Sequence, residues 1–155
     1  MAIRVLPLVE PANDHSRIID MARRNSSLGL FGRFGRSEDL RRLDGALRSV
    51  DLHPSMVPEA VKLTVVNLLK DHAIGDEPAP QAYRSAAEIL GYCMIGAEGF
   101  AGVNGVPLAL QVEERIERAL EHGDRLDAQL VLVTMAAKVI QPSVVAHFAL
   151  TSEAD

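Results

Sequence analysis

The residues best suited to binding an anion lie in and just before a predicted loop over residues 25–36. This segment, NSSLGLFGRFGR, has three glycines, no acid and no helical period, which is typical of a loop. Arginine beside aromatic side chains can grip phosphate and stack on bases, and glycine lets backbone N–H groups approach an anion. The candidate anion-binding residues are Arg23, Arg24, Arg33 and Arg36.

The alternative for this loop is a solvated segment whose Phe31 and Phe34 pack on the rest of the chain. Four arginines form a smaller basic surface than nucleic-acid-binding proteins usually have. Residues 1–50 carry nine arginines and six acids, but residues 51–155 carry seven basic residues and fifteen acids. That acidic portion would repel nucleic acid, so we favour the solvated loop and do not expect nucleic acid as a partner. If nucleic acid does bind here, its affinity should fall steeply with salt.

A second candidate is a run of glycines at every third position: Gly96, Gly99, Gly102 and Gly105. One interpretation is a backbone cradle for a small anionic ligand, although the Lys-Ser/Thr of a phosphate-binding loop is missing and no G-x-G-x-x-G occurs. The other is a helix C-terminus followed by a tight turn, where glycine supplies a positive φ. We favour the turn.

A possible metal site lies in the loop from Asp71 to Glu77. Asp71, His72, Asp76 and Glu77 offer oxygen and nitrogen ligands suited to a divalent cation. Their spacing does not match a calcium-binding loop, and no H-E-x-x-H is present. Solvated acids are the commoner reason for such a cluster, and we expect no cofactor.

Other chemistry-bearing residues give no specific signal. Cys93 is the only cysteine and lies in the most apolar stretch, so its thiol should be buried and inert. No G-x-S-x-G elbow supports a serine hydrolase. The segment after Ser55 is mostly Val and Leu with only Lys62 and Lys70 as bases, which argues against a DNA-recognition helix.

Helical periodicity predicts the elements that would hold these candidates. Apolar residues recur at i, i+3 and i+4 along most of the chain, and capping residues stand at the expected ends. We predict an all-α fold: a compact bundle of about six to seven helices behind an extended N-terminal arm. The predicted helices lie near 14–24, 37–50, 55–73, 79–98, 107–122, 124–140 and 143–151.

Several details of these helices are also predicted. Ser37, Ser55, Asp124 and Ser143 should cap helices, Gly123 should end one, and residues 99–106 should be a connector. Asp44 and Arg48 form an i,i+4 pair. Gly45 costs its helix about 1 kcal/mol relative to Ala, which a close helix crossing would explain.

Composition predicts one soluble domain over residues 1–155, with an arm, short helix and basic loop over 1–36 and a helical body over 37–151. No secretory signal is visible at the N-terminus. The longest strongly apolar run without charge, Ala128–Ala137, has ten residues, whereas a membrane span needs about 20. We therefore expect no membrane association and a cytoplasmic location.

The function predicted from these patterns is a non-enzymatic protein-interaction or regulatory module that self-associates as a dimer. Residues 89–97 and 128–137 lack charge on every face, and a single small bundle has room for one such helix. A symmetric dimer would bury the excess, with Gly91, Gly96 and Ala97 permitting close approach. The alternatives are a helical enzyme or small-ligand binder with a pocket near Gly96–Gly105, and a weak nucleic-acid binder using the Arg23–Arg36 loop.

Overall fold

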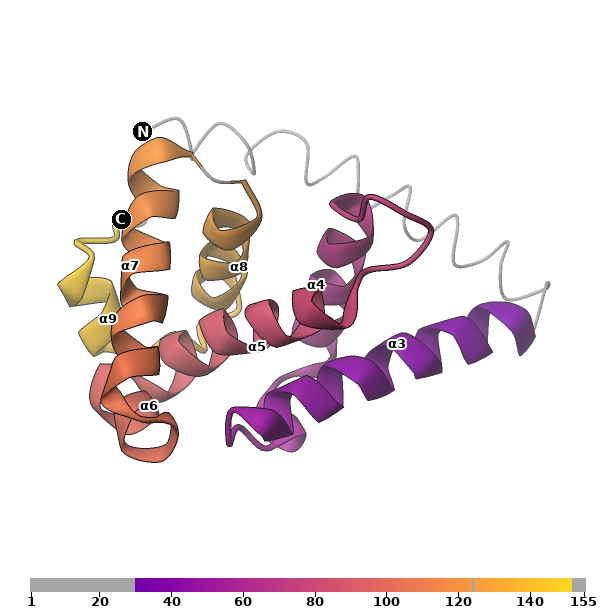
Figure 1. The fold of residues 1–155 in the computed structure, drawn as a ribbon, viewed down its shortest axis with the longest axis horizontal. Helices are drawn as coiled ribbons and strands as arrows, with labels where there is room; N and C mark the ends of the chain where they lie inside the picture. Colours follow the sequence, from indigo (N-terminus) through magenta and orange to yellow (C-terminus); the bar gives the residue numbers. More distant parts are fainter. Residues whose placement is uncertain (1–29, 124, 152–155) are drawn as a thin grey trace. The chain divides into compact units, whose positions relative to one another are not determined.

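The computed structural model describes residues 30–123 and 125–151, and this part of the chain is all-helical, with no strand (Figure 1). The all-α prediction is therefore confirmed. The predicted arm, the predicted helix at 14–24 and the capping residue Asp124 lie outside the described residues. The helices are α3 (Leu30–Ser49), the 3-10 helix η2 (Pro54–Met56), α4 (Glu59–Asp71), α5 (Pro80–Ile95), α6 (Ala97–Asn104), α7 (Val106–His122), α8 (Arg125–Ala136) and α9 (Pro142–His147).

The chain divides into two units. The larger one, Asp39–Leu150, is called the core unit below. The described residues of the smaller unit are Thr151 and residues 30–38, the first part of α3.

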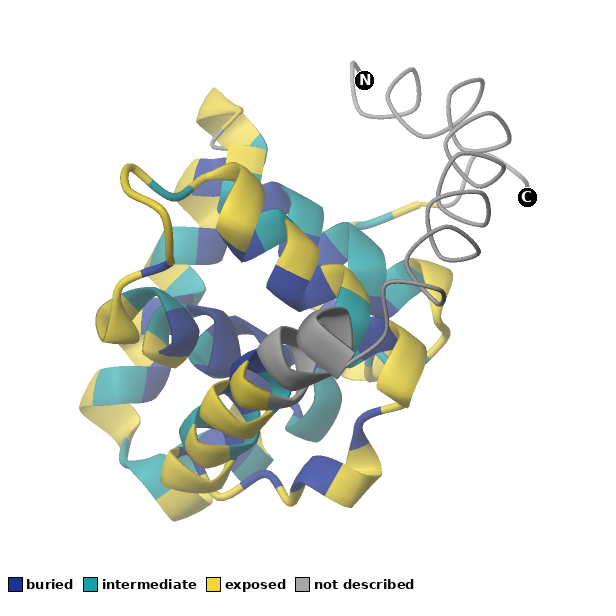
Figure 2. Ribbon diagram, turned by 90° about the vertical axis from the view of Figure 1, so that its right-hand side faces the viewer, coloured by how far each residue is buried: buried dark blue, intermediate teal, exposed yellow. Residues whose placement is uncertain are grey.

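The centre of the core unit is α5, which packs against α4, α6, α7 and α8. Residues 89–93 are all buried, and Met94 and Ile95 are half-buried. Around the other helices except α8, buried residues alternate with exposed ones (Figure 2), whereas α8 has no exposed residue from Leu126 to Met135. The charge-free segment of α5 is thus covered by the chain's own helices. The other charge-free segment, residues 128–137, is buried or half-buried up to Met135.

A close contact between α5 and α6 depends on Gly91. A Cβ at this position would lie 3.0 Å from Cε1 of Phe100 and 3.4 Å from Cγ2 of Val50. The Phe100 ring is fully buried and packs edge-on against Tyr92, with centroids 6.0 Å apart. Gly91 therefore admits an aromatic ring of the same chain, not the helix of a second copy as predicted.

The prediction of a loop over residues 25–36 is wrong for its described part, residues 30–36, because α3 begins at Leu30. Ser37 consequently lies inside this helix and does not cap it. Glycine weakens a helix by about 1 kcal/mol per residue but does not forbid it. The predicted close crossing at Gly45 is also wrong, since a Cβ there would meet nothing within 4 Å.

The predicted connector over residues 99–106 is mostly helical, because α6 runs to Asn104 and α7 starts at Val106. Gly96 and Gly105 bound α6 with φ of +91° and +97°, and Gly99 and Gly102 lie within it. The regular glycine spacing thus combines two turn positions that require a positive φ with two positions inside a helix.

Three helix boundaries also differ from prediction. Ser55 belongs to η2, and α4 starts after Pro58. The helix predicted to reach residue 140 ends at Ala136, because Lys138 has a φ of +61°. The N-cap of α9 is Gln141 rather than Ser143; its backbone N–H donates to the Cys93 carbonyl at 2.8 Å. Gly123, at a φ of +75°, ends α7 as predicted.

Within the residues that the structure describes, no helix is both long and apolar enough to span a bilayer.

Replacing Phe100 by Ala should lower the free energy of unfolding by about 3–5 kcal/mol, the usual cost of deleting a buried aromatic ring. Phe100 is the only buried residue of α6. Urea denaturation measures the loss. Glu98→Gln, at an exposed position of the same helix, should change stability by less than about 1 kcal/mol. Equal effects of the two changes would contradict this account of α6.

Candidate functional site

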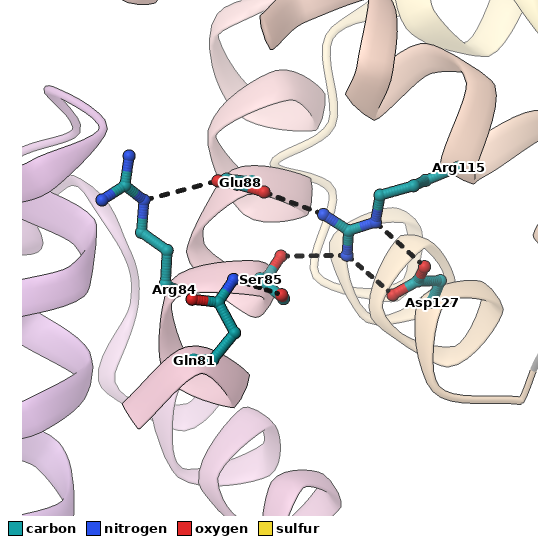
Figure 3. Close-up of polar contacts among 6 residues, drawn as sticks. All are labelled: Gln81, Arg84, Ser85, Glu88, Arg115 and Asp127. Atoms are coloured by element: carbon teal, nitrogen blue, oxygen red, sulfur yellow. Dashed lines mark hydrogen bonds and ion pairs between the residues drawn. The ribbon is translucent and has the colours of Figure 1, made fainter. Parts of the chain in front are cut away.

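A polar network joins α5, α7 and α8 through Arg115 (Figure 3). Its guanidinium group donates to Glu88 Oε1 at 2.9 Å, to both carboxylate oxygens of Asp127 at 3.0 and 3.3 Å, and to the Ser85 carbonyl at 3.2 Å. All three charged side chains are less than a quarter exposed. Bidentate pairs of this kind fix geometry as well as charge.

Arg84 extends this network to the surface. Its Nε lies 3.4 Å from Glu88 Oε2, the carboxylate that also holds Arg115. The terminal nitrogens of Arg84 point away from Glu88 (Figure 3), and the side chain is 45% exposed. Glu88 thus orients Arg84 while leaving its outer edge accessible.

A second buried charge, Asp39, ties α3 to α4 and α5. Its carboxylate lies 2.6 Å from Lys70 Nζ and accepts a hydrogen bond of 3.3 Å from the Tyr83 hydroxyl. Burial, followed by the Asp39 charge, raises the pKa of Tyr83. Nearby, Asp44 pairs with Lys62 at 3.1 Å instead of with Arg48 as predicted.

Between α3 and the start of α5 runs an open groove of about 450 Å³. Small residues of α3 line one side, whereas two prolines and Tyr83 line the other. Arg42 and Arg84 contribute charge, and Arg42 Nη1 contacts Glu77 Oε1 at 2.6 Å. The complete lining is Arg42, Gly45, Ala46, Ser49, Glu77, Pro78, Pro80, Tyr83 and Arg84. No sequence pattern predicts this groove, although Gly45 stands out in the sequence as a costly residue within a helix.

A smaller pocket of about 310 Å³ lies where α5, α6 and α9 meet. Tyr92 donates a 3.0 Å hydrogen bond to Glu113 Oε2, and His147 Nε2 lies 2.7 Å from the same oxygen. Burial and the Glu113 carboxylate raise the pKa of Tyr92. The lining also includes Ser143 and the first turn of α6. A pocket does occur at the Gly96 end of the glycine run, and its polar groups come from helices distant in the sequence.

The corner between α6 and α7 exposes three large apolar side chains: Val103, Val106 and Leu110 are each more than half exposed. Elsewhere in the described residues, only Met56 and Ile74 are large hydrophobics exposed to this degree. We call these three residues the apolar corner. Val106 and Leu110 are four residues apart on α7 and therefore share a face.

The predicted anion-binding residues belong to two separate candidates, the glycine run and the arginines, and only the glycine run lies wholly within the described residues. Gly96 and Gly99 line the smaller pocket, but Gly102 and Gly105 do not. Arg33 and Arg36 belong to α3, although their side chains lie outside the described residues, as do Arg23 and Arg24 altogether. Binding of an anion or nucleic acid by these arginines stays a prediction.

The predicted metal ligands do not converge. Among the residues described, no group of three or more His, Cys, Asp or Glu side chains is placed to hold a metal ion. His72 Nε2 instead lies 3.1 Å from the Gln129 amide oxygen, and Glu77 pairs with Arg42. Asp71 and Asp76 are exposed.

Comparison of the chain with protein-family models, with curated proteins and with solved structures finds no match.

Replacing Arg115 by Met should destabilise the protein by about 2–4 kcal/mol, because it strands two partly buried carboxylates. Arg118→Met is the matched control: it lies on the exposed face of the same helix and should cost less than about 0.5 kcal/mol. Thermal or urea unfolding measures both. If Arg115→Met lowered the free energy of unfolding no more than Arg118→Met, the network would contribute little to stability.

The Cys93 thiol should be unreactive in the folded protein. It is fully buried, and burial raises its pKa to about 12, whereas an unfolded thiol titrates near about 8.5. Because the folded-state pKa is raised, its contribution to stability is present below pH ~8.5 and is lost as the pH rises towards 12. A disulfide reagent at pH 8 should label the thiol only in denaturant. Rapid labelling of the native protein would contradict its burial.

Proposed function

We propose that this chain is a protein-interaction module that self-associates through the apolar corner. The observation that carries the proposal is the exposure of Val103, Val106 and Leu110 within eight residues. Scattered exposed hydrophobic residues need no explanation, but a group of them marks an interaction site. Repetition of the same patch on each copy would allow a two-fold symmetric contact.

The hydrogen bonding of the buried polar side chains also favours a protein-interaction function over catalysis. No buried side-chain nitrogen or oxygen in the described residues lacks a hydrogen-bond partner. Enzyme sites usually concentrate converging polar groups in an enclosed pocket, whereas the strongest polar groups here are satisfied by one another in the Arg115 and Asp39 clusters. Joining the helices is enough to explain both clusters without a catalytic role.

Small-ligand binding is a second candidate, and one observation favours it. The Tyr92 hydroxyl and the His147 imidazole meet at Glu113 beside a pocket that also has the Ser143 hydroxyl in its wall. A screen of small polar molecules by thermal unfolding would test this function. A ligand of this pocket should lose its effect in His147→Gln.

Self-association predicts a particle of twice the 16.8 kDa chain mass at micromolar concentration, measured by light scattering or sedimentation. Replacing Val106 and Leu110 by Glu should return the mass to that of one chain, because charges would be buried in the contact. Ile74→Glu, at a fully exposed apolar residue outside the apolar corner, is the control and should leave the mass unchanged. A wild-type mass that stays at one chain on concentration would refute the proposal.

A further inference from the structure

We propose that the groove between α3 and α5 is a docking site for an extended acidic peptide segment of another protein. One carboxylate of the segment would bind Arg84, and its small apolar side chains would lie on the floor near Gly45 and Pro80. This site is separate from the apolar corner, and the proposal does not depend on self-association.

Gly45 leaves the groove open at the middle of α3. Glycine in the middle of α3 costs about 1 kcal/mol relative to alanine, and no close helix packing offsets that cost. A Cβ there would meet nothing within 4 Å, and the residue lines the groove. The missing side chain therefore keeps open a surface that the protein's own fold leaves empty.

Arg84 presents a guanidinium group that can bind a ligand carboxylate. Glu88 binds only its Nε, and among the described residues no other partner is found for its terminal nitrogens. These nitrogens point away from Glu88 (Figure 3), and the residue lines the groove. Because Arg115 and Asp127 hold Glu88 in place, a ligand carboxylate would meet a guanidinium group that is already oriented, which reduces the entropy lost on binding.

The remaining lining distinguishes an acidic peptide from nucleic acid. Glu77 pairs with Arg42 in the same groove, and the core unit has ten basic against fifteen acidic residues. This charge would repel a polyphosphate and equally a peptide with a run of acids. The segment therefore carries a single carboxylate, which needs only one guanidinium group. Pro80, Ala46 and Gly45 offer an apolar surface open to solvent beside the buried Pro78, which suits a segment laid along it better than an enclosed small molecule.

The test is selection of random octapeptides displayed on phage against the full-length protein at low salt, followed by affinity measurements on the enriched peptides. We expect enriched peptides to carry Asp or Glu flanked by small apolar residues. Arg84→Met should weaken their binding about ten- to a hundredfold, the range for a charge-assisted bidentate contact. Changing the acidic peptide residue to its amide should weaken binding similarly, and the two losses should not add.

Gly45→Leu should block the groove and weaken binding at least about tenfold. Gly102→Leu is the matched control: Gly102 is also an exposed helix glycine with nothing within 4 Å of its Cβ, but it lies outside the groove, so binding should not change. Urea midpoints establish that the variants fold, and Gly45→Ala replaces Gly45→Leu if the latter does not. No acidic enrichment, or undiminished binding by either Arg84→Met or the folded Gly45 variant, would overturn the proposal.

Discussion

A helix without charge on any side is stable in water only when other elements cover all of its faces. In this protein that helix is the second half of α5, and α4, α6, α7 and α8 pack around it. The last gap is filled by Phe100, whose ring fits where Gly91 has no side chain. Covering α5 therefore constrains where the surrounding helices lie, and it buries one of the two charge-free segments from which a dimer was predicted.

Charged residues join the helices that the apolar core brings together. Asp39 connects α3 with α4 and α5, and Arg115 connects α7 with α5 and α8. Both use the acceptor capacity of carboxylates that are buried, as in Asp39, or partly buried, as in Glu88 and Asp127, and that would otherwise carry a desolvation cost. The same network that holds the bundle together also orients Arg84 at the surface, so the candidate docking groove depends on interactions whose first role is structural.

The all-α class and the approximate span of most helices could be predicted, because periodicity and capping act locally. The start of α3 and the existence of α6 could not be predicted, because both segments contain glycines, which suit loops as well as helices. Packing against the rest of the chain decides between helix and loop. Asp44 shows the same limit for polar pairs: Arg48 is nearer in sequence, but Lys62 on α4 is the actual partner. The two sides of the candidate groove are 28 or more positions apart in the sequence, and only folding places Gly45 opposite Pro80.

The two positive-φ glycines that bound α6 have a consequence for motion. Gly96 and Gly105 give this eight-residue helix a turn at each end, and Phe100 is its only buried residue. Local opening needs few contacts to break where few side chains are buried. The amide hydrogens of α6 should therefore exchange with solvent as a group and sooner than those of α5. Such an opening would briefly uncover Tyr92 and Gly91, making α6 a cover over the centre of the bundle.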